Sequence, residues 1–246
     1  MDAILDKVTV GGKEIEYHTQ KGRRRKSITI TVSDACHVVV QAPRGLSKGK
    51  IHDIVRKKSG WILKKQADFR RLKERYPAKE YISGEQILFL GRKYRLKIIE
   101  SKDASGSEPV LTGRRIIVRI QQELLMENRK QIIRNALLNW YHSRAAEVLM
   151  ERAKRYSGML KLVPVKIIVR NQVKRWGSCS RSGVLRFNWR VALAPVSIVD
   201  YVVVHELCHL KEKNHSGEFW RRVSLAIPDY KKRRQWLKDN PVGTDI

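Results

Sequence analysis

Apolar and polar residues alternate along much of the first half of the chain, which predicts β-strands that bury one face. Residues 4–18 alternate around Gly11 and Gly12, and these turn-forming residues predict a β-hairpin. A second hairpin is predicted around Gly91 and Arg92. Strands are expected at residues 27–32, 37–41, 86–90, 94–99 and 115–120. This half of the chain is therefore expected to be rich in β-structure.

The spacing of apolar residues changes to a helical period in two long segments. One segment runs from Ser47, a predicted N-cap, to about Tyr76, and its polar face is crowded with lysine and arginine. The other runs from Gln122 to about Tyr156, and Trp140 lies on its apolar side. We expect each segment to form one helix.

These elements predict an α+β fold with a boundary near Gln121. The boundary separates a β-rich N-terminal region, 1–121, which contains one helix, from a C-terminal region, 122–246. In the C-terminal region the long helix is expected to support a β-hairpin from residue 165 to residue 192 and the helix that follows it. No internal repeat is apparent in the sequence.

The segment after this hairpin predicts a helix, a sharp turn and a second helix. Ser197 and Asp200 have the spacing of a capping box and are expected to start the first helix. Asn214 tolerates a left-handed backbone and is expected to end it. Ser216 is the predicted N-cap of the second helix. Such a turn directs residue 215 back towards the first helix.

A His-Glu-x-x-His motif, His205, Glu206 and His209, lies on the first of these helices. The two histidines are one helical turn apart on one face, where both can bind a single metal ion. His215 is expected to supply the third nitrogen, which leaves the fourth position open to water. Glu206 is adjacent to this water and is expected to act as general base and acid. The pattern predicts a catalytic zinc site.

Other residues compete for some of these roles. Glu218 and Asp229 are alternative third ligands, because some zinc hydrolases use a carboxylate from the following helix. His142 is a further histidine, which we expect to be packed or at the surface. No spacing argument selects the residue that stabilises the oxyanion, for which the candidates are Arg175, Arg186 and Tyr201.

The charge of the chain adds candidate partners. The 246 residues include 52 Lys and Arg against 24 Asp and Glu, which gives a formal net charge of +28 at pH 7. Such a surface attracts polyanions, so nucleic acid and nucleotides are candidate partners besides a protein or peptide substrate. No named nucleic-acid-binding motif is present.

The three cysteines and the hydropathy pattern are used to predict the cellular compartment of the protein. Cys36, Cys179 and Cys208 are too few for a disulfide framework, and we expect the last two to be small core residues. No apolar run is long enough to cross a bilayer, and the first residues do not form a signal peptide. We expect a cytoplasmic protein with no membrane contact.

Several short motifs follow one another along the C-terminal region. They are Arg175-Trp176-Gly177-Ser178-Cys179, Asn188-Trp189-Arg190, the segment from Asp200 to Leu210, Asn214-His215-Ser216, Phe219-Trp220 and Pro228-Asp229-Tyr230. With looser matches at 27–30 and 42–45, these motifs make the chain resemble the YgjP-like metallopeptidase family, which is related to SprT-like zinc proteases.

The resemblance implies a zincin-like catalytic domain over 122–246 in a bacterial or archaeal protein. It also implies zinc at His205, His209 and His215, with Glu206 as the acid and base. The ligand spacing equals that of the metzincins. However, Glu212 stands where metzincins have glycine, and no methionine follows to form their Met-turn.

Three functions are compatible with these features. The leading hypothesis is a zinc-dependent hydrolase, most simply a metalloprotease that acts on protein held on nucleic acid, as SprT-like relatives do. The alternative is a metal-dependent nucleoside triphosphate pyrophosphatase, whose phosphates would be bound by lysine and arginine. A nucleic-acid-associated binding protein with a structural metal is the third, and Glu206 disfavours it, because a structural site needs no base.

Overall fold

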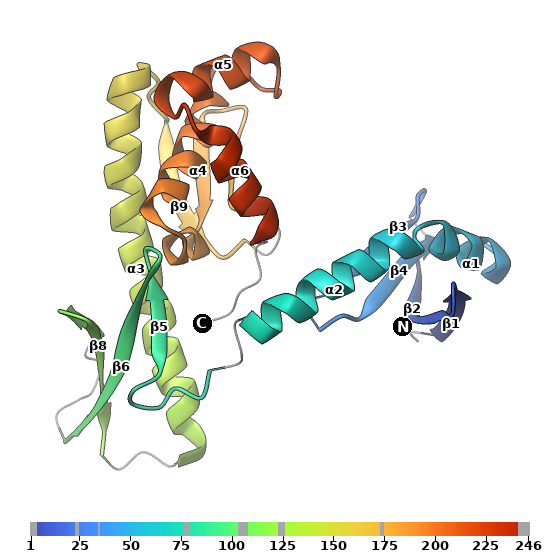
Figure 1. The fold of residues 1–246 in the computed structure, drawn as a ribbon, viewed down its shortest axis with the longest axis horizontal. Coiled ribbons are helices and arrows are strands. Elements are labelled where there is room, and N and C mark those ends of the chain that lie inside the picture. The colour runs from blue at the N-terminus through green and yellow to red at the C-terminus, as the bar shows by residue number, and fades with distance from the viewer. Residues whose placement is uncertain are drawn as a thin grey trace. The chain divides into compact units, whose positions relative to one another are not determined.

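The computed structural model (Figure 1) describes residues 4–22, 25–33, 35–75, 79–102, 108–122, 126–172 and 175–240. It contains helices and sheets, which confirms the predicted α+β class. The chain divides into two compact units, Met1–Pro77 and Ala78–Ile246. The predicted helix end at Tyr76 lies outside the described residues.

The first unit contains a four-stranded sheet. Its strands, in the order β1-β2-β4-β3, are β1 (Ile4–Val10), β2 (Lys13–Gly22), β3 (Thr29–Val32) and β4 (Val38–Pro43). β1 and β2 form the predicted hairpin, and Gly11 and Gly12 have φ values of 57° and 74°, as a type I′ turn requires. Alternate residues of β2 and β4, such as Tyr17 and Val40, are buried in a core that this unit forms by itself.

Two helices, α1 (Lys48–Lys57) and α2 (Ser59–Arg75), replace the single helix predicted in this region. Ser47 is the N-cap of α1, as predicted, and its hydroxyl accepts a hydrogen bond from a backbone N–H in the first turn. The helix is interrupted at Lys58, where φ is −99° and ψ is 5°. A break of one residue does not change the spacing of apolar residues enough to be predicted from the sequence, and Trp61, just beyond the break, is 45% exposed.

The second unit begins with another four-stranded sheet. Its strands, in the order β5-β6-β8-β7, are β5 (Gln86–Phe89), β6 (Arg92–Ser101), β7 (Val110–Thr112) and β8 (Arg115–Gln121). β5 and β6 form the second predicted hairpin, and its turn residues Leu90 and Gly91 both have positive φ. β7 was not predicted, because three residues are too few to show alternation.

The two four-stranded sheets share one topology. In each, the first two strands form an antiparallel hairpin, the second and fourth strands pair in parallel, and the third and fourth pair antiparallel. Each sheet is followed by a helix. The fold thus contains a repeat that the sequence did not reveal.

The remainder of the second unit supports the histidine motif. The long helix α3 (Met126–Leu160) forms as predicted, with Trp140 and Tyr141 buried, and packs against α4 (Val196–Cys208). Between them in sequence is a three-stranded sheet with the strand order β10-β11-β9. Its strands are β9 (Lys166–Arg170), β10 (Gly177–Cys179) and β11 (Val184–Asn188).

The predicted hairpin from residue 165 to residue 192 is correct only in part. β10 and β11 are antiparallel neighbours, but β9 pairs with β11 in parallel. After β11 the chain forms a 3₁₀ helix, η1 (Trp189–Leu193), where a strand was expected. No helix in the described part of the chain is both long and apolar enough to cross a bilayer.

The division into compact units after residue 77 does not coincide with the boundary placed near Gln121. Strands β5 to β8 share one hydrophobic core with α3, and the ring centroids of Phe89 and Trp140 are 5.0 Å apart. The turn between β5 and β6 is also tied to η1, because the N–H of Leu90 donates to the carbonyl of Ala192 at 2.7 Å. This sheet therefore belongs with the helical region.

Candidate metal centre

The histidine motif lies at the end of α4, a helix with buried residues along most of its length. The apolar run from Tyr201 to Val204 packs in the core with α3 and η1. This packing fixes the position of the helix, and hence of the side chains that project from its last turn.

Both predicted ends of this helix are wrong. α4 begins at Val196 after Pro195, and no side chain caps it. Asp200 cannot complete a capping box because it is buried, with its Oδ1 3.6 Å from the Nε of Arg152 on α3. The helix ends at Cys208, before Asn214, so a longer non-helical loop leads to residue 215.

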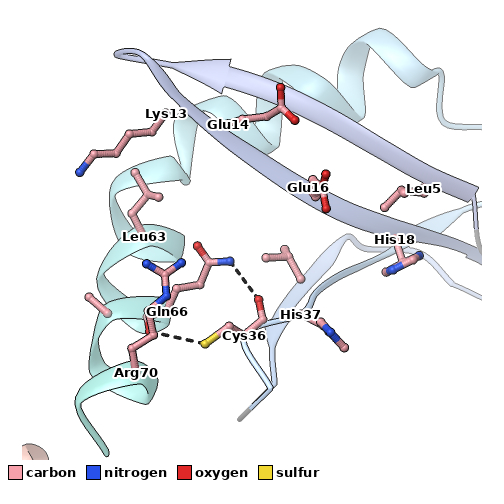
Figure 2. Close-up of a pocket in the computed structure, with 12 residues that line it drawn as sticks. Leu5, Lys13, Glu14, Glu16, His18, Cys36, His37, Leu63, Gln66 and Arg70 are labelled. Atoms are coloured by element: carbon pink, nitrogen blue, oxygen red, sulfur yellow. Dashed lines mark hydrogen bonds between the residues drawn. The ribbon is translucent and has the colours of Figure 1, made fainter. Parts of the chain in front are cut away.

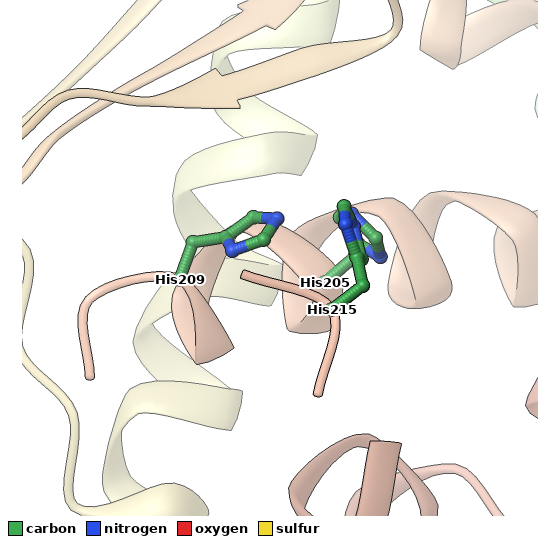
Figure 3. A group of neighbouring side chains, drawn as sticks. All are labelled: His205, His209 and His215. Atoms are coloured by element: carbon green, nitrogen blue, oxygen red, sulfur yellow. The ribbon is translucent and has the colours of Figure 1, made fainter. Parts of the chain in front are cut away.

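The three predicted ligands lie together (Figure 3). His205 and His209 project from α4, and His215 comes from the loop before α5 (Gly217–Ala226). Ring centroids are 4.9 Å apart for His205 and His209, and 4.8 Å apart for His209 and His215. The Nε2 atoms of His205 and His215 are 3.0 Å apart. Ser216 caps α5 as predicted, which fixes the chain immediately after His215.

Neighbouring groups orient two of these rings. The Nδ1 atom of His209 is 2.8 Å from the carbonyl oxygen of Glu212. A carbonyl oxygen only accepts hydrogen bonds, so Nδ1 carries the proton and Nε2 keeps a lone pair for a metal. The ring of Trp220 stacks on His215 at 5.5 Å, and Tyr230 stacks on Trp220 at 5.1 Å.

The donor set fits a divalent metal such as zinc. One nitrogen from each histidine lies within 4.8 Å of the others, and nitrogens around a tetrahedral zinc are about 3.3 Å apart. Burial, and then the neighbouring His209 and His215, lower the pKa of His205 to about 3, so this ring is neutral as a ligand must be. No acidic residue or cysteine in the described part of the chain joins the group.

Glu206 is buried, lines one pocket with His205 and faces β10. A Cβ atom added to Gly177 would lie 2.8 Å from the Cγ and Oε1 atoms of Glu206, so a glycine is required opposite the carboxyl group. Burial raises the pKa of Glu206 to about 8, and Arg175 acts in the opposite direction. A cation bound by the histidines would lower the pKa of Glu206, in the same direction as Arg175.

The alternative third ligands are engaged in ion pairs. Glu218 accepts two hydrogen bonds from the Arg221 guanidinium, at 2.7 and 2.8 Å, and this hydrogen bonding lowers the pKa of Glu218. Asp229 lies 2.8 Å from Arg233. His142 is packed beside an indole ring of η1 and is remote from the histidine group.

The three cysteines are free. Cys208 is fully buried, which confirms its predicted core position, and Cys179 is partly buried. Burial raises the pKa of both thiols, to about 12 for Cys208.

A pocket of about 340 Å³ opens beside His205 and Glu206. Among the oxyanion candidates, Arg175 and Tyr201 line this pocket, whereas Arg186 is not one of its lining residues. Sequence analysis missed Arg234 and Lys238 of α6 (Tyr230–Asp239), which also line it. Their spacing of four residues puts them on one helical face, but the sequence around them does not indicate which part of the protein that face lies against.

A second cavity, of about 540 Å³, lies in the first unit between the sheet and α2 (Figure 2). Its lining includes His18, Cys36 and His37, and the Gln66 amide donates to the Cys36 carbonyl at 2.9 Å. No predicted site residue lies here. Its histidines and acidic residues do not form a metal-binding group among the residues that the structure describes.

Comparison with known proteins identifies a family for this chain. The model of the YgjP-like family, described as a metallopeptidase domain, matches residues 26–240. A solved structure that is similar in part is that of the metallopeptidase zymogen of Pyrococcus abyssi abylysin, which is 24% identical. The similarity covers 37% of this chain and 92% of that chain, with a TM-score of 0.34. No curated protein matches the chain.

Proposed function

The chain belongs to the YgjP-like metallopeptidase family, and from this premise we propose that it is a zinc-dependent protease. In this proposal His205, His209 and His215 hold the zinc and Glu206 transfers the proton. The observation that carries it is the proximity of the three imidazoles, since one nitrogen of each lies within 4.8 Å of the others. The buried carboxyl group of Glu206 lines the same pocket as His205 and is outside the ligand set.

The residues of the chain have separate tasks in this reaction. When bound, zinc supplies positive charge that polarises the scissile carbonyl group and makes water more acidic. The Glu206 carboxylate takes a proton from the attacking water and donates it to the leaving amine nitrogen. Arg175 and Tyr201 are the residues we assign to stabilise the developing oxyanion, because both line the pocket next to Glu206.

The position of β10 at the edge of the three-stranded sheet favours a peptide as the substrate. β10 is an edge strand, and its Gly177 adjoins Glu206. An edge strand has backbone N–H and C=O groups that can bind an extended peptide as an added strand. A peptide bound there would run directly past the proposed reacting centre.

The test is cleavage of casein by the purified, zinc-loaded protein, with and without a chelator. We expect proteolysis that the chelator abolishes and added zinc restores, together with about one zinc ion bound per chain. A protein that binds zinc but cleaves neither casein nor any peptide of a mixed library would refute the protease assignment.

A metal-dependent nucleoside triphosphate pyrophosphatase is the second candidate. The feature that favours it is the group of cations Arg175, Arg234 and Lys238 in the pocket beside Glu206, since such groups bind phosphates. A nucleotide panel distinguishes the two activities. Chelator-sensitive release of pyrophosphate without proteolysis would replace the protease assignment.

We also propose that nucleic acid is a partner, through the net charge of +28. In the first unit, α2 carries Lys64, Lys65, Arg70, Arg71 and Lys73 against few acidic residues. The expected result is a DNA mobility shift that weakens steeply as salt concentration rises.

We also propose a cytoplasmic, reducing location, which the free cysteines support.

A further inference from the structure

The pocket beside Glu206 is built from three segments of the second unit. α4 contributes Tyr201 and Val202 as well as His205 and Glu206, the start of β10 contributes residues 175–177, and α6 contributes Arg234, Leu237 and Lys238. A ligand in this pocket therefore lies directly against the proposed reacting centre. Its volume of about 340 Å³ is at the small end of the range for ligand sites, roughly 300 to 1,000 Å³, which suits a side chain rather than a large molecule.

The charges on the pocket are mostly positive. Its lining includes the cations Arg175, Arg234 and Lys238 against one carboxylate, that of Glu206. Neither Arg234 nor Lys238 forms an ion pair with a carboxylate among the described residues. By contrast, Arg233 of the same helix is paired with Asp229 at 2.8 Å. The pocket thus presents an excess of positive charge, carried by Arg234 and Lys238.

The guanidinium group of Arg234 is held in place. Its Cζ atom is 4.7 Å from the ring centroid of Trp220, and this indole itself stacks with His215 and with Tyr230. A guanidinium stacked on a fixed ring loses little conformational freedom when it binds a carboxylate, and its planar fork matches the two oxygens. Arg234 is therefore prepared to bind an anion next to the histidines.

The interior of the pocket is apolar. Trp176, Val202 and Leu237 line it and can pack against the methylene groups of a substrate side chain. A phosphate chain would have no use for this apolar surface, whereas an aspartate or glutamate has a methylene stem and a terminal carboxylate. A lysine side chain would meet three like charges.

We infer that this pocket is a subsite that selects an acidic residue, aspartate or glutamate, next to the scissile bond of a protein substrate. The inference rests on the proposed protease function and names the substrate class of the same site. Arg234 and Lys238 are its specificity-determining residues. The preference over lysine is expected to be on the order of tenfold or more, as for a charge-assisted hydrogen bond at a partly exposed site.

The first experiment measures cleavage. The zinc-loaded full chain is incubated with a peptide library, and the cleaved bonds are identified by mass spectrometry. We expect an acidic residue to be enriched at one position beside the cleaved bond. In a matched peptide pair, Arg234→Gln should abolish the preference through KM with kcat little changed, and Arg234→Glu should favour lysine. Lys232→Gln, an equal loss of charge at a residue of α6 that does not line the pocket, should retain the preference.

The second experiment separates this inference from the protease function. Peptides with a central glutamate, leucine or lysine are bound to zinc-loaded Glu206→Gln protein, and Kd is measured by fluorescence anisotropy. Tightest binding of the glutamate peptide, reduced about tenfold by Arg234→Gln or Lys238→Gln but not by Lys232→Gln, supports the subsite even if no peptide is cleaved. Equal binding of the three peptides, a preference that survives both pocket substitutions, or preferential binding of inorganic pyrophosphate over the glutamate peptide overturns it.

Discussion

Gly177 and Glu206 face each other so closely that a Cβ atom on Gly177 would lie 2.8 Å from the Cγ and Oε1 atoms of Glu206. Gly177 does not have positive φ, so alanine is compatible with its backbone. The expected effect of Gly177→Ala is therefore displacement of the carboxyl group, not local unfolding. The Gly177→Ala variant therefore changes the position of the Glu206 carboxyl group while leaving the carboxyl group itself in place.

We expect Gly177→Ala to retain zinc and to lose activity on the order of a hundredfold, the lower part of the range for loss of a general acid and base. Zinc content by mass spectrometry and kcat/KM on one peptide test this. Gly158→Ala is the matched control, because a Cβ atom there has open space. Unchanged activity in Gly177→Ala would mean that Glu206 tolerates displacement and does not need a fixed position.

Glu206→Gln should keep the metal and lose turnover by a factor of about 100 to 10,000, because an amide cannot accept and return the proton. The three histidines, which make up the ligand group, remain unaltered. Near-normal rates with bound zinc would remove Glu206 from the mechanism. Circular dichroism and metal analysis of the same sample exclude misfolding.

The third ligand is tested by a pair of substitutions on either side of Ser216. His215→Ala should lower bound zinc from about one per chain to near zero after dialysis, since two histidines alone bind weakly. Glu218→Ala should keep the metal, because Glu218 is paired with Arg221 instead of pointing into the group. The reverse result would make Glu218 the ligand.

The hairpin turn between β5 and β6 should be sensitive to a single methyl group. A Cβ atom on Gly91 would lie 2.8 Å from the Cα of Pro195, and Gly91 has a φ of 74°. Gly91→Ala should destabilise the second unit on the order of 3 kcal/mol, through backbone strain and steric overlap. Gly113→Ala, with φ of 55° but open space, should show only the strain, about 1 kcal/mol. Urea unfolding measures both, and equal losses would show that the contact with Pro195 has no effect.

The burial of Tyr17 predicts that the folded state loses stability at alkaline pH. Burial, and then the nearby Asp6, raise the pKa of Tyr17 to about 12, above its usual value near 10. Because the folded state favours the protonated phenol, the resulting contribution to folding stability is fully present below about pH 10 and is lost as pH rises from about 10 to 12. Tyr17→Phe should remove part of this loss, on the order of 1 kcal/mol, and should be tolerated at pH 7, because the buried hydroxyl makes no hydrogen bond. Hydrogen exchange in residues 13–22, compared at pH 8 and pH 11, measures the difference.

Local patterns were sufficient for the first two hairpins and for the cap before α5. Gly11 and Gly12 form the predicted turn, and Ser216 caps α5 as expected. These features depend on residues a few positions apart, where backbone preferences decide the structure. The approach of His215 to His205 and His209 was predicted correctly, but the sharp turn expected to produce it is replaced by a longer loop that begins after Cys208.

Long-range packing decided what the sequence did not reveal. The start of α4 is set by Pro195 and by burial of Asp200 near Arg152, not by a local capping box. The sheet β5 to β8 joins the second unit because Phe89 packs on Trp140, which are far apart in sequence. Likewise, Arg234 reaches the pocket through tertiary packing of α6, and an exposed cation carries no hydrophobic signal of its position.

The shared topology of the two four-stranded sheets has a consequence for the room available in their hairpin turns. The turn of the second sheet lies against the start of the histidine helix, where a Cβ atom on Gly91 would be 2.8 Å from the Cα of Pro195. The equivalent turn of the first sheet, Gly11 and Gly12, has no atom within 4 Å of an added Cβ. A larger side chain in the first turn therefore meets only the strain of a positive φ, whereas in the second turn it would also push on the segment that leads into the histidine helix.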